Sequence, residues 1–414
     1  MDNMFKKNRE KFINQMENGV IYIAFAGKNH PRTADQPYPF TPRRNFYYLT
    51  GIKDPVIILT IFKDADGKVI ETLYLERYDE KVAKWDGAVI NTEKAQELSG
   101  IENFREIERF ETDMGRLFFS TDALKVQMDL ENRYFASGTT AEGRFAAKIK
   151  DSYPHIVIEN AYPAIVRLRT TKSDEEVALI KKACGITGEA IVKMMQNSRP
   201  GMMEYELTAH FDFHLRMSGV KETSFSTIAA SGRNATILHY QTNDAQTKDG
   251  DLILFDLGAQ WNYYAADISR TFPVNGKFTE RQKELYNIVL AVQKKVIGMM
   301  KDGVEYKDLN QAVKDYYAVE LKRIGLIKED AEVSKYYYHG VSHHLGLDVH
   351  DPNRMTDGIL RKGMVLTVEP GLYVAEENIG IRIEDNVLVT EDGAVVLSEG
   401  IPKTVEEIEA VMKK

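Results

Sequence analysis

Two aspartates, eleven positions apart, stand beside apolar segments that are typical of buried strands. Asp256 follows the apolar run Leu252–Phe255, and Asp267 opens a second segment. Because side chains alternate along a strand, Ser269 and Thr271 share the face of Asp267. An ionised carboxylate among apolar side chains is costly unless it is paired or binds a metal. If the two segments pair as antiparallel strands, both carboxylates point at one spot, where a divalent cation would remove their repulsion.

Further residues of the kinds that bind metals follow in the same half of the chain. Glu369 ends an apolar, strand-like run, and Glu384 stands among the apolar residues of another. A segment before them, residues 336–351, contains four of the nine histidines: His339, His343, His344 and His350.

This set of side chains has a chemistry of its own. Four carboxylates carry too much negative charge for one divalent ion and suit two ions held about 4 Å apart. Oxygen-rich ligands with one imidazole fit Mn²⁺, Co²⁺, Fe²⁺ or Zn²⁺. The spacing alone leaves open the alternative that each acid is a hydrogen-bonded core residue.

The elements that must position these residues begin after a polar joint. Ser173, with Glu176 three residues later, has the pattern of a capping box at a helix start. Apolar residues then recur at helical spacing through Cys184, which we expect in the core. Helices are also predicted over residues 203–218 and 280–300, and strands over 250–272 and 364–397. We therefore predict an α+β fold with an N-terminal domain, 1–165, and a catalytic C-terminal domain, 166–414.

The smaller N-terminal domain is predicted to be α/β. Strands are expected over residues 20–27, 55–62 and 69–76, and the Asp66-Gly67 pair between the last two indicates a hairpin turn. Four prolines between Pro31 and Pro42 predict an extended surface loop. In the C-terminal domain, the tyrosine run Tyr336–Tyr338 is expected to form a buried or interface strand.

Composition and charge describe a globular chain. Its 414 residues are 43% hydrophobic, and a net charge of −8 argues against a broad nucleic-acid-binding surface. The single cysteine excludes an intrachain disulfide and fits a reducing compartment. The sequence has no signal-peptide pattern and no apolar run long enough to span a bilayer, so we expect a cytoplasmic protein without membrane contact.

Four segments, in order, carry a family resemblance. HGVSHHLGLDVHD at 339–351 resembles the signature HGxSHxLGxxVHD of the proline-peptidase branch of the pita-bread metallopeptidases (peptidase family M24). FDLGAQWNYYAADISRTFP, TVEPGLY and GIRIEDN resemble the remaining metal segments of that family. The resemblance covers roughly residue 166 to the C-terminus. RRNFYYLTG at 43–51 resembles the smaller N-terminal domain of the aminopeptidase P type.

The resemblance implies a two-metal site. Its ligands would be Asp256, Asp267, His343, Glu369 and Glu384. Asp267 and Glu384 would bridge two divalent ions, with Mn²⁺ expected and Co²⁺, Zn²⁺ or Fe²⁺ as alternatives. We take His343, and not the adjacent His344, as the histidine ligand. The complete set separates this chain from creatinase-like relatives, which share the fold but lack the ligands.

The implied reaction is hydrolysis of the bond between an N-terminal residue and a penultimate proline, by a hydroxide that bridges the two ions. The catalytic residues would be Glu369, which moves the proton, together with His239 and His350. The substrate-binding residues would be His239, His339, Val349, His350, Tyr373 and Arg382. The implied partners are peptides with proline at position two, and the implied assembly is a homodimer or homotetramer.

Three other functions stay in view. An Xaa-Pro dipeptidase (prolidase) shares the metal motifs, and only the cleft beyond the proline separates it from an aminopeptidase. A catalytically inactive binding homologue is disfavoured by the complete set of five ligands. Methionine aminopeptidase is disfavoured by the long N-terminal domain and by the VHD segment.

Overall fold

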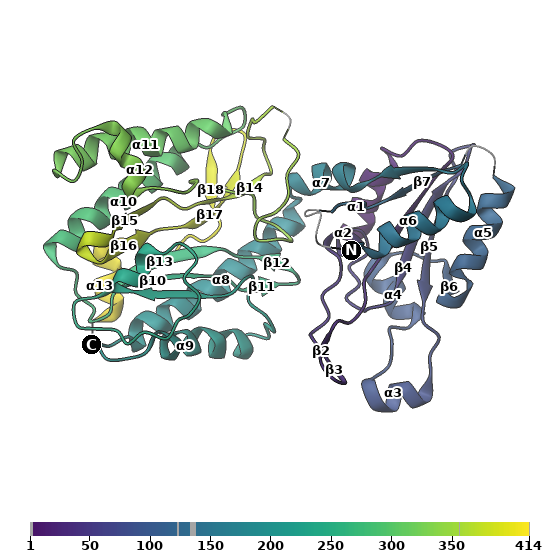
Figure 1. The fold of residues 1–414 in the computed structure, drawn as a ribbon, viewed down its shortest axis with the longest axis horizontal. Helices are drawn as coiled ribbons and strands as arrows, with labels where there is room; N and C mark the ends of the chain where they lie inside the picture. The colour runs from purple at the N-terminus through teal and green to yellow at the C-terminus, as the bar shows by residue number, and fades with distance from the viewer. Residues whose placement is uncertain (1–2, 122–123, 133–137, 356, 414) are drawn as a thin grey trace. The chain divides into compact units, whose positions relative to one another are not determined.

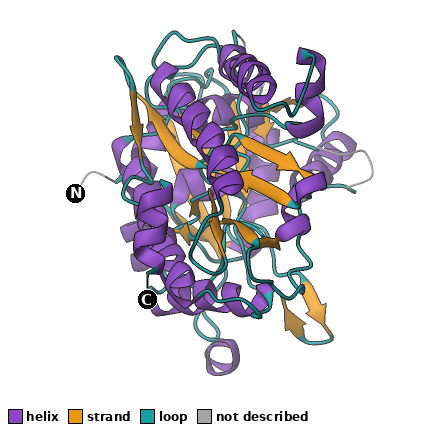
Figure 2. Ribbon diagram, turned by 90° about the vertical axis from the view of Figure 1, so that its left-hand side faces the viewer, coloured by secondary structure: helices purple, strands orange, loops and turns teal. Residues whose placement is uncertain are grey.

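The computed structural model describes residues 3–121, 124–132, 138–355 and 357–413. The chain divides into two compact units, Met1–Leu168 and Arg169–Lys414. Helices and strands are mixed in both of them (Figures 1 and 2). None of the helices in the described ranges is both long enough and apolar enough to cross a membrane.

The first unit is built on a six-stranded mixed sheet with the strand order β6-β5-β4-β1-β7-β8. The strands are β1 (Val20–Phe25), β4 (Ile58–Lys63), β5 (Val69–Leu75), β6 (Phe104–Glu106), β7 (Lys125–Met128) and β8 (Val157–Asn160). β1 pairs antiparallel with β4 and parallel with β7. The strands predicted over 20–27, 55–62 and 69–76 are confirmed, as is the hairpin that joins the last two.

The helices of this unit are α1 (Met4–Ile13), α2 (Arg44–Thr50), α3 (Glu80–Asp86), α4 (Thr92–Ser99), α5 (Phe110–Ser120) and α6 (Ala141–Ser152), and α7 (Tyr162–Thr170) crosses the boundary to the second unit. Phe110 and Ile149 bring α5 and α6 onto a core cluster that contains Ile21, Val126 and Met128.

The prediction of a loop over the prolines at 31–42 was partly wrong. This segment contains a short, exposed hairpin, β2 (Pro31–Thr33) with β3 (Gln36–Pro37). Both strands pair only with each other, so they are edge strands, and proline is tolerated in edge strands because its missing N–H is not needed there.

The second unit opens with the predicted capping box. Ser173 Oγ accepts from the Glu176 N–H at 3.3 Å, and Glu176 Oε2 accepts from the Ser173 N–H at 2.9 Å. The helices of this unit are α8 (Asp174–Asn197), α9 (Glu204–Met217), α10 (Glu280–Met299), α11 (Tyr306–Arg323), α12 (Val333–Tyr336) and α13 (Val405–Met412). The helices predicted over 203–218 and 280–300 are confirmed, and Cys184 is buried in α8.

Small antiparallel sheets form the middle of the second unit. Their strands are β9 (Ile228–Ser231), β10 (Leu252–Leu257), β11 (Gln260–Trp261), β12 (Tyr264–Ala265), β13 (Ile268–Pro273), β14 (Val365–Val368), β15 (Gly371–Val374), β16 (Ile379–Arg382), β17 (Asp385–Val389) and β18 (Ala394–Val396). Helix α10 packs on β14, β15 and β16, whereas α8 packs on β11, β12 and β13. The strands therefore lie between helices on two sides, as Figure 1 shows.

The strand predicted at Tyr336–Tyr338 was wrong. Tyr336 ends helix α12, Tyr337 follows as its C-cap, and Tyr338 is exposed. The Tyr337 ring packs edge-on against Tyr317, and its hydroxyl donates to Asn310 Oδ1 at 2.6 Å. These contacts satisfy a buried tyrosine without a neighbouring strand.

Candidate metal centre

The two aspartates come from adjacent strands. In the antiparallel register of β10 and β13, Asp256 lies opposite Ser269 and Leu257 lies opposite Ile268. Asp267 directly precedes β13 and therefore lies on the face that Asp256 and Ser269 share. The predicted antiparallel pairing is thus confirmed. Asp267 is only 4% exposed, and the Asp256 side chain is 14% exposed.

The two glutamates come from the second half of the unit. Glu369 directly follows β14, and Glu384 lies between β16 and β17. The Glu384 N–H donates to the Ser269 carbonyl at 3.1 Å, and its Oε2 accepts from Ser269 Oγ at 2.8 Å. These two bonds join a segment near the end of the chain to the aspartate strands, so that all four acids gather at one place.

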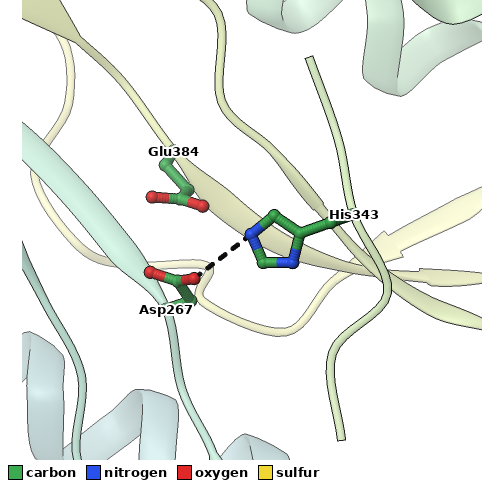
Figure 3. Close-up of side chains that lie close together, drawn as sticks. All are labelled: Asp267, His343 and Glu384. Atoms are coloured by element: carbon green, nitrogen blue, oxygen red, sulfur yellow. Dashed lines mark ion pairs between the residues drawn. The ribbon is translucent and has the colours of Figure 1, made fainter. Parts of the chain in front are cut away.

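His343 completes the cluster. Its Nδ1 lies 3.1 Å from the His344 carbonyl oxygen, which can only accept, so Nδ1 donates this hydrogen bond. Nε2 faces the acids and lies 3.4 Å from Asp267 Oδ2 and 3.5 Å from Glu369 Oε1. Figure 3 shows Asp267, His343 and Glu384 pointing toward one another from three different segments.

The electrostatics of the cluster are strained without a cation. Burial raises the pKa of both Asp267 and Glu384 well above the ordinary carboxyl value, and the neighbouring carboxylates raise each pKa further. Burial raises the pKa of Glu369 to about 7, although His343 and Arg382 act in the opposite direction. A site that excess negative charge destabilises in this way favours a bound cation.

Unsatisfied oxygen atoms mark where such a cation fits. Asp256 Oδ1 and Glu384 Oε1 are buried, and neither has a hydrogen-bond partner among the described residues. One ligand atom from each of Asp267, His343 and Glu384 lies within 4.8 Å of the others. Carboxylate oxygens that lack such partners, beside an imidazole nitrogen that faces the acids, are a donor set that suits a divalent metal.

Three of the residues expected in the substrate pocket form a buried chain behind Asp256. Arg382 donates to Asp256 Oδ2 at 2.6 Å and to the Tyr373 hydroxyl at 3.1 Å. Tyr373 Oη lies 2.8 Å from Nε2 of His339, whose Nδ1 faces the Gly340 carbonyl. Burial, followed by the charge of Arg382, lowers the pKa of His339 to about 4, so this histidine is neutral near pH 7. This hydrogen-bonded row of side chains fixes Oδ2 of Asp256, whereas Oδ1 has no hydrogen-bond partner among the described residues.

The remaining predicted residues lie toward the surface. His350 is exposed, and its ring packs edge-on against His343 with 4.3 Å between the centroids. Val349 beside it is partly buried. His239 is also exposed, in the segment after the 3₁₀ turn Gly232–Thr236, and its charge contributes to the lowered pKa of His339. The structure gives His239 no direct hydrogen bond to the acid cluster.

Supporting residues that the sequence analysis missed surround the acids and His343. Asn386 Oδ1 accepts from the Asp267 N–H at 3.0 Å, and Asn386 Nδ2 donates to the Asp267 carbonyl. Cys184 Sγ also donates to Asn386 Oδ1, at 3.2 Å. Asp351 accepts from Arg169 at 2.6 Å and from Lys172 at 3.1 Å, which holds the loop after His344. The available signal was the run of polar residues, Asp385 and Asn386, inside an apolar strand.

The comparisons with known proteins agree with this geometry. The model of metallopeptidase family M24 matches residues 178–391, and the model of the aminopeptidase P N-terminal domain matches residues 5–126. The chain belongs to metallopeptidase family M24, and it carries the two-domain α+β architecture that was predicted, with the pita-bread domain at its C-terminal end.

Individual relatives narrow the comparison to one branch of that family. The Xaa-Pro aminopeptidase of Escherichia coli K12 is 33% identical over 433 residues, which cover 99% of this chain and 97% of the relative. The solved structure of E. coli aminopeptidase P with the inhibitor Pro-Leu has a TM-score of 0.90 and 32% identity, and covers 99% of this chain and 97% of that one. A Bacillus anthracis structure, described provisionally as an aminopeptidase P, has a TM-score of 0.97 and 47% identity, with 99% and 98% covered.

Proposed function

We propose that this chain is a metal-dependent aminopeptidase that hydrolyses the bond between an N-terminal residue and a penultimate proline. One observation carries the proposal: four acids and the Nε2 of a histidine converge in a buried site where two carboxylate oxygens have no hydrogen-bond partner among the described residues. The relatives named Xaa-Pro aminopeptidase, which match over nearly the whole chain, support the same activity.

The residues that would hold the divalent ions are Asp256, Asp267, His343, Glu369 and Glu384. Their oxygen-rich character, with one imidazole, favours Mn²⁺, with Co²⁺, Zn²⁺ and Fe²⁺ as alternatives. A Zn-substituted structure of E. coli aminopeptidase P is among the similar structures and is consistent with a site that accepts more than one ion. Bound divalent ions would polarise the scissile carbonyl and allow water to attack near neutral pH.

Glu369 is the residue of this chain best suited to move a proton. A carboxylate at the reacting centre can accept a proton from the attacking water and pass it to the leaving group. Oε1 of Glu369 lies 3.5 Å from His343 Nε2, so it faces the reacting region. We assign it proton transfer from the attacking water to the leaving nitrogen.

The exposed histidines are assigned to the substrate. His239 would donate to the carbonyl oxygen on which negative charge develops, and His350 would hydrogen-bond the peptide around the scissile bond. An X–Pro bond has no N–H, so a site for it needs a shaped wall and no acceptor at that nitrogen. Val349 and the rings of His339 and Tyr373 are the candidates for that wall, which would accept the trans isomer.

The alternative activity is that of an Xaa-Pro dipeptidase. The mouse protein of that name is 30% identical over 470 residues, which cover 99% of this chain and 93% of the relative, so the fold accommodates both activities. The aminopeptidase and dipeptidase activities differ in whether the substrate cleft stays open beyond the proline. The bacterial aminopeptidases match at higher identity, which favours the aminopeptidase.

We also propose a homodimer or homotetramer working in a reducing compartment such as the cytoplasm. The support for the compartment is the composition, since the only cysteine is buried and no disulfide within the chain is possible. The support for the assembly is the family resemblance alone, and sedimentation of the purified chain tests it.

A matched pair of peptides, Xaa-Pro and Xaa-Pro-Yaa-Yaa, tests the proposed activity. Hydrolysis of each is measured after chelation, after readdition of Mn²⁺, and with the Asp267→Asn variant. Cleavage of the longer peptide that requires both Mn²⁺ and Asp267 is expected. Cleavage of the dipeptide alone would make the chain a dipeptidase. Failure to cleave either peptide, with Mn²⁺ demonstrably bound, would refute the assignment.

A further inference from the structure

One buried carboxylate outside the acid cluster organises an entire segment of the second unit. Glu204, in the first turn of α9, is fully buried. Its Oε1 accepts from the N–H and the hydroxyl of Ser231, at 2.7 and 2.8 Å, and from Asn234 Nδ2 at 3.2 Å. Its Oε2 accepts from the Tyr240 hydroxyl and from the Ala245 N–H, both at 3.0 Å. The five donors all belong to residues 231–245, and none of them is a lysine or an arginine.

The segment that Glu204 holds is the one that carries His239. Leu238 and Tyr240, on either side of His239, pack against an apolar cluster that includes Tyr373. The Tyr338 hydroxyl donates to the Thr236 carbonyl at 2.6 Å. The position of this segment therefore decides where His239 lies relative to the hydrogen-bonded side chains of Arg382, Tyr373 and His339.

Further contacts show that the segment is built to a fixed position. A Cβ atom at Gly380 in β16 would lie 2.1 Å from the Ala235 carbonyl oxygen, so the 3₁₀ turn rests directly on that strand. Asn243, at a positive φ of 50°, accepts from the Ala229 N–H and donates to the Thr227 carbonyl. Between these contacts, Glu204 connects the start of the segment, at Ser231, with its end, at Ala245.

We infer that Glu204 is a positioning residue that holds His239 in place for the substrate. The inference rests on the proposed function, because the role of His239 belongs to it. A buried carboxylate is tolerated only when its oxygens are satisfied, and five donors from one segment provide that satisfaction. An ionised carboxylate can only accept hydrogen bonds. Each of the five groups must therefore donate to it, which fixes their orientation. Displacement of a substrate-contacting group by about 1 Å can cost about 100-fold in rate.

Glu204→Gln tests the inference with little change of shape. The amide oxygen can still accept from Ser231, but the amide NH₂ then meets the Ala245 N–H, which is also a donor. The matched control is Glu206→Gln on the same helix, whose amide oxygen can keep the capping contact to the Met203 N–H and which does not touch residues 231–245. Tyr240→Phe, which deletes a single bond to Glu204, serves if the first variant does not fold.

Three readouts decide the outcome. For Glu204→Gln we expect kcat/KM on Xaa-Pro-Yaa-Yaa to fall about 10-fold to 100-fold, with Mn²⁺ affinity by calorimetry unchanged. Amide hydrogen exchange is expected to quicken within residues 232–245. In a double-mutant cycle, Glu204→Gln should add little to the loss caused by His239→Ala, because both act through the same group. Tyr240→Phe should show a smaller loss of the same kind.

Four results would overturn the inference. They are losses that multiply in the cycle, weaker Mn²⁺ binding in Glu204→Gln, an equal effect of Glu206→Gln, and unchanged exchange within residues 232–245. If the wild-type chain cleaves no Xaa-Pro peptide, the proposed function fails, and the exchange measurement still decides whether Glu204 holds the segment.

Discussion

Glu384 and Asp385 are neighbours in the chain, and both are buried acids, but their charged surroundings shift their pKa values in opposite directions. Glu384 faces three other acids, one of its oxygens has no hydrogen-bond partner among the described residues, and burial raises its pKa well above the usual range. Asp385 accepts from Arg270 at 2.8 Å and from Lys403 at 2.6 Å. Burial alone would raise the pKa of Asp385, but these two cations outweigh it and hold the pKa well below its usual range.

This difference in neutralisation distinguishes the candidate metal site around Glu384 from the structural ion pairs of Asp385. Asp385 receives two further hydrogen bonds, from Gln293 and from Ser398, so its charge is neutralised within the protein. The acid cluster is less fully neutralised: among the described residues its four carboxylates face one arginine, Arg382 at Asp256, and the imidazole of His343. A buried carboxylate whose partners are complete stabilises the fold, whereas one whose partners are incomplete requires a ligand.

The largest effect is expected from replacing Asp267, which we propose as a bridging ligand. Asp267→Asn should lower kcat/KM on Xaa-Pro-Yaa-Yaa at least about 10³-fold, equivalent to about 4 kcal/mol of transition-state stabilisation. Metal content by mass spectrometry should fall at the same time. Asp249→Asn, an exposed acid hydrogen-bonded to Asn275, is the control and should keep both. Normal metal content in Asp267→Asn would remove this residue from the ligand set.

Breaking the paired acid should instead cost stability. Asp385→Asn leaves Arg270 buried without its counter-charge, and the free energy of unfolding should fall by about 3 kcal/mol or more. Urea denaturation of the chelated protein and of the Mn²⁺-loaded protein should show a similar loss. A loss confined to the loaded protein would mean that Asp385 acts through the metal and that the comparison with Glu384 is wrong.

The two kinds of acid predict opposite dependences of stability on pH. Glu369 has its pKa raised to about 7, so the folded, chelated protein binds more protons than the unfolded chain above about pH 4.3. Its stability should therefore fall as the pH rises from about 4.3 through about 7.

The contribution of Asp351 to stability depends on pH in the opposite direction. Burial would raise its pKa, but Arg169 and Lys172 lower it to about 2, so its contribution is lost as the pH falls from about 3.9 through about 2. Denaturant titrations across this range, with chelator and with Mn²⁺, check both slopes. Mn²⁺ should remove the decline above pH 4.3, because ligand carboxylates stay deprotonated. The same decline in both series would show that it does not originate in the cluster.

The smallest effect concerns the doubled histidine. His344 is buried, burial lowers its pKa to about 3, and neither ring nitrogen has a hydrogen-bond partner in the described part of the chain. Its ring stacks on Tyr306, so His344→Phe keeps the packing and removes two unsatisfied polar atoms. We expect a gain of about 1 kcal/mol in the free energy of unfolding.

Thermal denaturation measures this gain, with the exposed His30→Phe as a control that should change stability by less than about 0.5 kcal/mol. Loss of Mn²⁺ binding in His344→Phe would indicate that His344, and not His343, is the ligand.

Local rules were enough to predict the two strand segments beside Asp256 and Asp267 and the common face of these two acids. Alternation along β10 and β13 brings Asp256 and Asp267 to one face, and the capping box at Ser173 depends only on residues three positions apart. Pairings between distant segments were beyond such rules. Asn386 contacts Asp267 across 119 positions, and Asp385 contacts Arg270 across 115. Nothing local distinguishes Glu384 from Asp385, because their partners become neighbours only in the folded chain.

The most direct test of this account compares Glu384→Gln with the wild type by urea denaturation, with chelator and with Mn²⁺ at about 100 times its Kd. Removing one charge from an unneutralised cluster should leave the chelated variant at least as stable as the chelated wild type. Mn²⁺ should raise the free energy of unfolding of the wild type by about 2.7 kcal/mol and that of the variant by much less. A chelated Glu384→Gln protein as destabilised as Asp385→Asn would contradict the account, because Glu384 would then already be neutralised by the protein itself.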